Sequence, residues 1–226
     1  MPNLFMVVGA AIGMCIPALA MAGDPHNYET VRVIDAHHQA RNMDASARPG
    51  IGRFVAGDQK QNFVTGSLAF GRAYGNGWRS EGEFVARRTD TYTSGSSAFT
   101  TSSNHHDVRS QRLMLNVYRD LAINQAWSLY ATAGAGLSHI QSGGWQGTPD
   151  RRHGKATRTG LAWSMGAGVS IAAGANMTVD LGYRYADLGR TESGWNTFAN
   201  ARGLQDEKLQ LDLVSREATL GLRYAF

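Results

Sequence analysis

Cysteine and proline are scarce in this chain of 226 residues. Its single cysteine is Cys15, and there are 5 prolines against 27 glycines. One cysteine excludes an intrachain disulfide and a metal site built from several thiolates. A composition rich in glycine and poor in proline is typical of many strands joined by tight turns.

Long apolar runs are also missing after residue 22, where no stretch reaches the roughly 18 apolar residues of a transmembrane helix. The mean hydropathy of −0.31 argues against a bundle of membrane helices. Only a closed β-barrel could carry this chain across a bilayer, because lipid cannot hydrogen-bond the open backbone groups of a sheet. The formal net charge is only +4 and is scattered, so it does not favour a nucleic-acid partner.

The first 22 residues differ from the rest because they carry no charged side chain and are almost wholly apolar between residues 5 and 20. Ala20-Met21-Ala22 has the small-x-small pattern of a signal-peptidase site. We therefore expect residues 1–22 to be a secretory signal peptide and residues 23–226 to form one domain. The alternative is an N-terminal membrane anchor, for which the apolar run is short.

After residue 60, apolar side chains recur at every second position, which indicates strands. The clearest case is 161–171, where one face is apolar and the other holds only alanine, serine and glycine. The same alternation is present in 63–74, 78–88, 112–118, 127–137, 179–185 and 217–226. A weaker pattern at Tyr28–Ala36 predicts the first strand, with Ile51–Ala56 as the alternative. In a barrel, the apolar face would meet lipid and the small residues would fit a crowded lumen.

The connections between these segments alternate between short and long. Gly75-Asn76-Gly77 is a tight hairpin signal. The other short connections are 121–125 and 173–176, and the long polar ones are 37–61, 89–108, 142–158 and 189–213. Short periplasmic turns and long external loops are typical of outer-membrane barrels, whereas a soluble sandwich has no reason to sort its loops. We therefore predict an all-β fold, an eight-stranded antiparallel up-and-down transmembrane β-barrel.

Acidic and basic residues are nearly balanced on the faces predicted to point inward. The interior of an eight-stranded barrel is just wide enough for side chains, and buried charges there must pair. We predict a lumen closed by a carboxylate–guanidinium network of Glu81, Glu83, Arg87, Arg112, Asp180, Arg184, Glu217 and Arg223, with Arg79 on the same face. The alternative is a set of solvated charges on the open face of a sheet, and the apolar opposite face disfavours it.

The C-terminal part of the chain resembles a known family. Residues 180–185, Asp-Leu-Gly-Tyr-Arg-Tyr, look like the penultimate strand of opacity-type surface proteins and their outer-membrane-protein-A-like relatives, and 217–226 is similar to their closing strand. The resemblance is strong over 160–226 and weaker over 61–140. It implies an eight-stranded barrel in the outer membrane, with loops that often serve adhesion to host cells. It also implies that Tyr224 and Phe226 form the C-terminal signal for the barrel-assembly machinery.

A basic cluster lies in the third long connection and consists of Arg151, Arg152, His153, Lys155 and Arg158. It could contact lipopolysaccharide phosphates or sulfated glycans of a host surface, or it could be a solvated loop. The pairs His37-His38 and His105-His106 also fall in long connections, but no carboxylate or thiolate spacing completes a metal site.

A catalytic site is not expected. Ser138 and His139 are adjacent in a predicted strand, so they face opposite ways and cannot pair as nucleophile and base. We expect no enzyme activity, no cofactor and no metal. A lipid-modifying barrel enzyme is the least favoured alternative.

Together these features predict an opacity-like outer-membrane surface protein of a Gram-negative bacterium, whose external loops recognise a ligand on a closed barrel platform. The alternative is a narrow porin for small solutes, which a charge-paired lumen disfavours. The expected partners are outer-membrane lipid and lipopolysaccharide, the barrel-assembly machinery, and a host-surface glycan or protein. We expect a monomer with its loops exposed at the cell surface.

Overall fold

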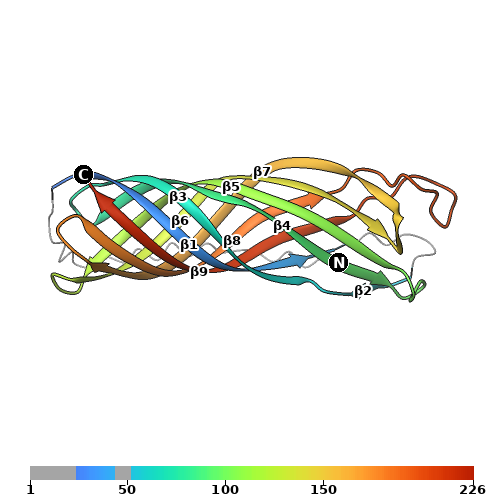
Figure 1. Ribbon diagram of the computed structural model, residues 1–226, viewed down its shortest axis with the longest axis horizontal. Helices are drawn as coiled ribbons and strands as arrows, with labels where there is room; N and C mark the ends of the chain where they lie inside the picture. Colours follow the sequence, from blue (N-terminus) through green and yellow to red (C-terminus); the bar gives the residue numbers. More distant parts are fainter. Residues whose placement is uncertain (1–23, 44–51) are drawn as a thin grey trace, which may run out of the picture.

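A computed structural model describes residues 24–43 and 52–226, and the regular secondary structure in these residues consists of β-strands (Figure 1). The predicted signal peptide, 1–22, lies outside the described residues. The strands are β1 (His26–Arg41), β2 (Phe54–Ala56), β3 (Lys60–Ala73), β4 (Trp78–Ser96), β5 (Ser103–Ala122), β6 (Trp127–Gln146), β7 (Thr148–Ala172), β8 (Met177–Glu192) and β9 (Gln210–Ala225). Within these two ranges, no helix has the length and apolar character needed to span a bilayer.

Eight of the strands in the described residues close into a ring. β1 pairs with β3 on one side and with β9 on the other, and the ring is completed through β4–β5 and the following hairpins. Neighbouring strands are antiparallel throughout. The short β2 is an addition that pairs with the end of β4. The predicted fold class, an eight-stranded antiparallel up-and-down barrel, is therefore confirmed.

The first strand of the ring is β1, which contains the predicted segment Tyr28–Ala36. Its side chains are alternately buried and exposed from Tyr28 to His38, as expected for a wall with a packed lumen on one side. The alternative segment, Ile51–Ala56, contributes only β2, and its first residue lies outside the described residues.

Outward-facing apolar side chains form a belt around the barrel. On β6, the outward residues from Trp127 to Leu137 are apolar and exposed. The ten residue steps between them span about 33 Å of strand. At a strand tilt of about 45° the belt is roughly 24 Å high, the height of the lipid-facing band of an outer-membrane barrel. Three cross-strand neighbours end the belt on the side of the long connections, and we call them its outer edge: Leu113, Leu137 and Leu161.

The prediction that 89–108 and 142–158 are long loops is wrong, because most of these residues continue the strands beyond the outer edge of the belt (Figure 1). β4 runs to Ser96 and β5 begins at Ser103, while β6 and β7 are separated only by Gly147, at φ 70°. Beyond the belt the outward face meets water instead of lipid, so these strands are polar and lose the apolar alternation that marks the membrane part. The other two connections are shortened to 42–59 and 193–209.

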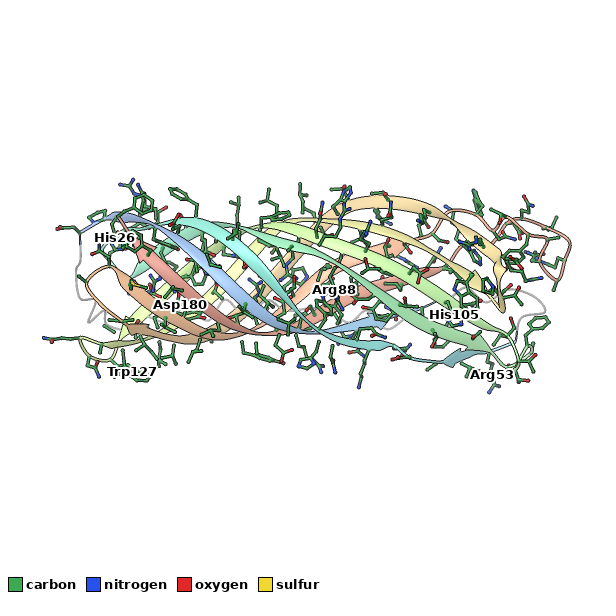
Figure 2. All side chains as sticks on the ribbon, in the orientation of Figure 1. His26, Arg53, Arg88, His105, Trp127 and Asp180 are labelled. Atoms are coloured by element: carbon green, nitrogen blue, oxygen red, sulfur yellow. The ribbon has the colours of Figure 1, made fainter. Side chains whose placement is uncertain are left out.

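The two ends of the barrel differ as the pattern of connections predicts. His26 and Trp127 lie at the end with the short turns, and Arg53 and His105 lie at the opposite end (Figure 2). The turn between β3 and β4 places Gly75 and Gly77 at φ 75° and 80°, a left-handed conformation that favours glycine.

Candidate functional site

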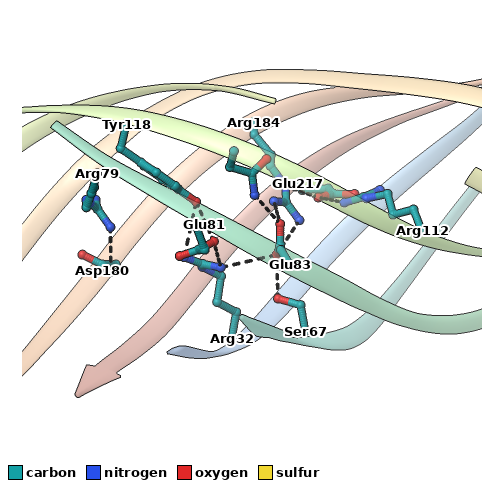
Figure 3. A network of polar contacts seen from close by, with 11 residues as sticks. Arg32, Ser67, Arg79, Glu81, Glu83, Arg112, Tyr118, Asp180, Arg184 and Glu217 are labelled. Atoms are coloured by element: carbon teal, nitrogen blue, oxygen red, sulfur yellow. Dashed lines mark hydrogen bonds and ion pairs between the residues drawn. The ribbon is translucent and has the colours of Figure 1, made fainter. Parts of the chain in front are cut away.

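The middle of the lumen is filled by ion pairs around Glu83, which is fully buried (Figure 3). Its carboxylate accepts hydrogen bonds from Arg184 on β8 and from Ser67 on β3, the latter with O···O 2.6 Å. Arg184 also donates to Glu217 on β9 with N···O 2.6 Å, and Arg112 on β5 donates to the same carboxylate oxygen. Glu83 and Glu217 thus tie opposite walls of the barrel together.

A second arm of the network joins β1 to β4. Arg32 donates two hydrogen bonds of 2.7 Å to the two carboxylate oxygens of Glu81, the geometry of a bidentate ion pair. Tyr118 donates to Glu81 at 3.1 Å, and the Arg32 guanidinium also lies 3.5 Å from Glu83. The two arms therefore form one connected cluster (Figure 3).

A further group of charges fills the lumen toward the short turns. Arg79 is buried and pairs with Asp120 at 2.8 Å, and its guanidinium lies 4.1 Å from the centre of the Tyr118 ring. Asp180 pairs with Arg223 at 3.2 Å and lies 3.9 Å from Arg79. The cation–π contact and the ion pairs hold these charged side chains together.

These contacts balance charge inside the barrel and leave little space. Five guanidinium groups face five carboxylates: Arg32, Arg79, Arg112, Arg184 and Arg223 against Glu81, Glu83, Asp120, Asp180 and Glu217. A cavity beside Arg32, Tyr118 and Tyr130 has a volume of only about 20 Å³, which is room for about one water. At this level the lumen is a packed polar core.

Eight of the nine side chains predicted to face the lumen do so: Arg79, Glu81, Glu83, Arg112, Asp180, Arg184, Glu217 and Arg223. Arg87 does not, because β4 contains a β-bulge between Val85 and Arg88. Three residue steps on β4 oppose two on β5, so the alternation reverses and Arg87 is exposed, donating to Gln111 at 3.2 Å.

Sequence reasoning did not assign Arg32, Tyr118 or Asp120 to the lumen network. Arg32 lies in the weakly patterned first strand, although its place between exposed Val31 and Val33 could have identified it as inward-facing. Tyr118 and Asp120 alternate with the apolar residues of β5, but nothing in the sequence indicates that they pair with β1 and β4.

The predicted basic cluster lies in β7 instead of a loop. Three of its members are exposed and form no ion pair with a described residue: Arg152, Lys155 and Arg158. Arg151 is half-buried, with its guanidinium 4.1 Å from the ring centre of Phe198. His153 is buried against the edge of the same ring and is therefore not part of the exposed surface.

Arg152 and Lys155 line a groove of about 500 Å³ beyond the outer edge of the belt. Other residues that line it come from β4, β5, β6 and the connection 193–209: Thr89, Asp107, Arg109, Gln141, Trp145 and Thr197. We call this feature the wall groove. Its charged side chains and its size make it a candidate binding site.

The two histidine pairs lie in β1 and β5 instead of loops, so the members of each pair face opposite ways. His38 and His106 are buried, whereas His37 is exposed. His105 stacks on Trp145 with ring centroids 3.5 Å apart, and burial lowers its pKa below the usual 6.5, so its ring is mostly neutral near pH 7. The described residues contain no cluster of three or more side chains suited to hold a metal ion.

Ser138 and His139 are separated by the wall of the barrel. Ser138 is buried and donates to the backbone oxygen of Leu188 at 2.6 Å. His139 lies on the outward face and contacts the Thr159 hydroxyl at 3.0 Å. This arrangement does not form a nucleophile–base pair.

Tyr224 and Phe226, predicted to be the assembly signal, are exposed at the end with the short turns. Phe226 lies 6.2 Å from Phe70 and 6.5 Å from Tyr224, measured between ring centroids. The three rings extend the apolar belt to its inner boundary, where aromatic side chains are usual. Their role in assembly stays a prediction.

Known proteins that are similar to this chain are outer-membrane β-barrels. The family model described as "outer membrane protein beta-barrel domain" matches residues 7–226. The chain is 28% identical over 130 residues to the outer membrane protein PagN of Salmonella typhimurium strain LT2, a match that covers 54% of this chain and 52% of that protein. The matched part therefore spans about half the length of that relative.

Two solved structures share the fold. Neisserial surface protein A (NspA) matches with a TM-score of 0.52 and 15% identity over 90% of this chain and 100% of its own. The outer membrane protein OprG from Pseudomonas aeruginosa matches with a TM-score of 0.52 and 12% identity over 90% of this chain and 99% of its own. At these identities the likeness concerns the fold alone.

Proposed function

Because the chain belongs to the outer membrane protein beta-barrel domain family, we propose that it is a surface adhesin, with a closed barrel as the platform and its extracellular end as the recognition surface. The predicted location in the outer membrane is confirmed by the same family. In this proposal the protein recognises a ligand without making or breaking a bond. The resemblance to opacity-type surface proteins supports the same role.

The observation that carries the proposal is the length of strand beyond the membrane. Thirteen residue steps separate Leu161, at the outer edge of the belt, from Thr148 at the tip of β7. They correspond to about 43 Å of strand. A nine- to eleven-residue strand suffices to cross the bilayer, so roughly half of β7 is free to present side chains outside.

The extracellular end offers both aromatic and cationic side chains to a partner. Trp195 is 57% exposed, and the Lys208 ammonium lies 4.5 Å from the centre of its ring. Arg152 is exposed nearby, since the backbone of 195–197 pairs with that of 152–154. Exposed tryptophan and arginine are the residue types that most often dominate binding energy, so these two are the proposed anchors.

Adhesion of bacteria that display the protein tests the proposal. The double variant Arg152→Gln/Trp195→Ala is expected to reduce binding to cultured host cells about tenfold, the effect of losing about 1.4 kcal/mol of binding energy. The matched control is Arg72→Gln/Tyr74→Ala, which removes an exposed arginine and an exposed aromatic at the short-turn end. It should leave adhesion unchanged.

Equal adhesion by the two double variants would contradict the proposed recognition surface. Treating the host cells beforehand with a glycosaminoglycan lyase or with a protease separates a glycan ligand from a protein ligand. Heat-modifiable gel mobility of each variant verifies that the barrel is folded before adhesion is compared.

The lumen geometry argues against the narrow-porin alternative, because five arginine–carboxylate pairs occupy the space that a solute would need. In planar bilayers the purified barrel is therefore expected to produce no stable openings, while a general porin in the same apparatus provides the positive control. Discrete openings whose conductance scales with salt concentration would favour the porin instead.

A further inference from the structure

The wall groove lies on the outward face of the strands beyond the belt, not in the lumen. Asp107 and Arg109, which line it, flank the fully buried Val108, so they share the outward face of β5 with Leu113 of the belt. On β6, Gln141 and Trp145 likewise follow Leu137 on the outward face. A ligand in this groove would lie beside the barrel wall.

The groove is also close to the membrane. Four residue steps separate Leu113 at the outer edge of the belt from Arg109 in the groove, which is about 13 Å along the strand. At the same strand tilt of about 45°, Arg109 stands roughly 9 Å above the hydrocarbon boundary. This is the height of lipid headgroups and of the sugars attached directly to them.

The floor of the groove is made from backbone. Gly143 and Gly144 line it where a register shift interrupts the pairing of β6 with β7, and Gly144 has φ 155°. A β-carbon on Gly144 would overlap the backbone oxygen of His105, so only glycine fits there. Trp145 also lines the groove, and its ring stacks on that of His105. The volume of about 500 Å³ falls within the range of small-molecule sites and can hold a saccharide.

The charge of the groove is positive and is not neutralised by the protein. Arg109, Arg152 and Lys155 form no ion pair with a described residue, in contrast to the arginines of the lumen. The Arg109 Nε donates to the Thr89 hydroxyl at 3.2 Å, which fixes the guanidinium along the wall. Asp107 is the only acidic side chain among the residues that line the groove, and it accepts from Thr91 at 2.9 Å.

We propose that the wall groove binds the phosphorylated inner sugars of lipopolysaccharide in the membrane that holds the barrel. Arg109 and Lys155 would bind phosphate, since guanidinium and ammonium groups both pair with its oxygens. Gln141 and Thr197 border the same space and can hydrogen-bond sugar hydroxyls. This role is separate from adhesion, because the ligand belongs to the same cell.

Position favours this ligand over a sulfated glycan of another cell, although both are anionic saccharides. A glycan that approaches from outside meets the tip of the β6–β7 hairpin first, whereas lipopolysaccharide sugars already surround the wall at the height of Arg109. A long-lived contact of this kind would hold the extended strands upright on the membrane.

The test titrates the full barrel, folded in zwitterionic detergent, with lipopolysaccharide that carries core phosphates and with the same glycolipid from a strain that lacks them. The variant Arg109→Gln/Lys155→Gln is expected to bind the phosphorylated form at least tenfold more weakly than the wild type. Both proteins should bind the form without core phosphates equally. The control Lys60→Gln/Arg202→Gln removes one exposed lysine and one exposed arginine elsewhere and should stay within twofold of the wild type.

A measurement on the wild-type protein tests the same proposal without depending on correct folding of the variant. Phosphorylated lipopolysaccharide should protect Lys155 from amine acetylation, measured by mass spectrometry, while Lys60 in the same sample remains reactive. Unchanged affinity of the double variant, or equal labelling of the two lysines, would overturn the proposal. Tight binding of a soluble heparin fragment at Lys155 without binding of lipopolysaccharide would also overturn it, by placing the ligand on another cell. Host-cell adhesion does not enter this test, so the two proposals can fail independently.

Discussion

Replacing Glu83 by alanine is expected to destabilise the folded barrel by about 3–5 kcal/mol, the usual cost of leaving a buried charge without its partner. In the wild-type lumen, Glu83 accepts hydrogen bonds from Arg184, Ser67 and Asn116 and is fully buried. The variant leaves five arginines facing four carboxylates in a space that has room for little water. The measurement is urea-induced unfolding in lipid vesicles, followed by tryptophan fluorescence.

The control for this variant is Asp206→Ala, which removes an exposed carboxylate paired with Arg202 at 2.7 Å. Exposed pairs of this kind contribute at most about 1 kcal/mol. If Glu83→Ala cost no more than Asp206→Ala, the network would fill the lumen without stabilising it.

A second replacement should recover much of the loss. In Glu83→Met/Arg184→Met, Arg32 keeps its bidentate pair with Glu81, and Arg112 keeps Glu217. The charges are balanced again, and exchanging a buried ion pair for apolar side chains of similar volume is often neutral or stabilising. The double variant is therefore expected to be more stable than Glu83→Ala.

The sequence predicts the barrel well because lipid imposes a strict alternation on every strand that it touches. From Trp127 to Leu137, each outward position is apolar, and each inward position is polar or small. Short turns at one end and long connections at the other fix the direction of the strands. These two patterns are local, so they require no knowledge of which strands are neighbours.

The same local patterns fail where the alternation is broken or where lipid is absent. The bulge at Val85/Arg88 turns Arg87 outward, and a single extra residue leaves no trace in composition. Beyond the belt, β7 is surrounded by water and its polar sequence resembles that of a loop. For this reason the wall groove could not be predicted from the sequence. The partners of Glu83 were also inaccessible, since Arg184 is 101 residues away and is brought near only by the closure of the ring.

Replacing Gly168 by alanine is expected to destabilise the barrel by about 3 kcal/mol, at the upper end of the cost of overpacking. Tyr130, Gly168 and Gly182 are cross-strand neighbours on β6, β7 and β8. The Tyr130 ring extends over both glycines, and a β-carbon on Gly168 would overlap that ring and the backbone oxygen of Leu181. The matched control is Gly160→Ala on the same strand, where no atom lies within 4 Å of the added β-carbon. Urea unfolding of both variants should show a loss only for Gly168→Ala.

Removing the Tyr130 hydroxyl separates a side-chain obstacle from a backbone obstacle. A β-carbon on Gly182 would meet side chains, namely the Tyr130 hydroxyl and the Thr219 hydroxyl at 2.9 Å. Tyr130→Phe should therefore recover stability in Gly182→Ala, because the obstructing hydroxyl is absent. It should not recover stability in Gly168→Ala, because the Leu181 carbonyl belongs to the β7–β8 ladder and cannot move without breaking it. Equal recovery in both backgrounds would mean that the backbone of the strands moves more easily than the Tyr130 side chain. The small inward residues would then not be what fixes the position of the Tyr130 ring in the lumen.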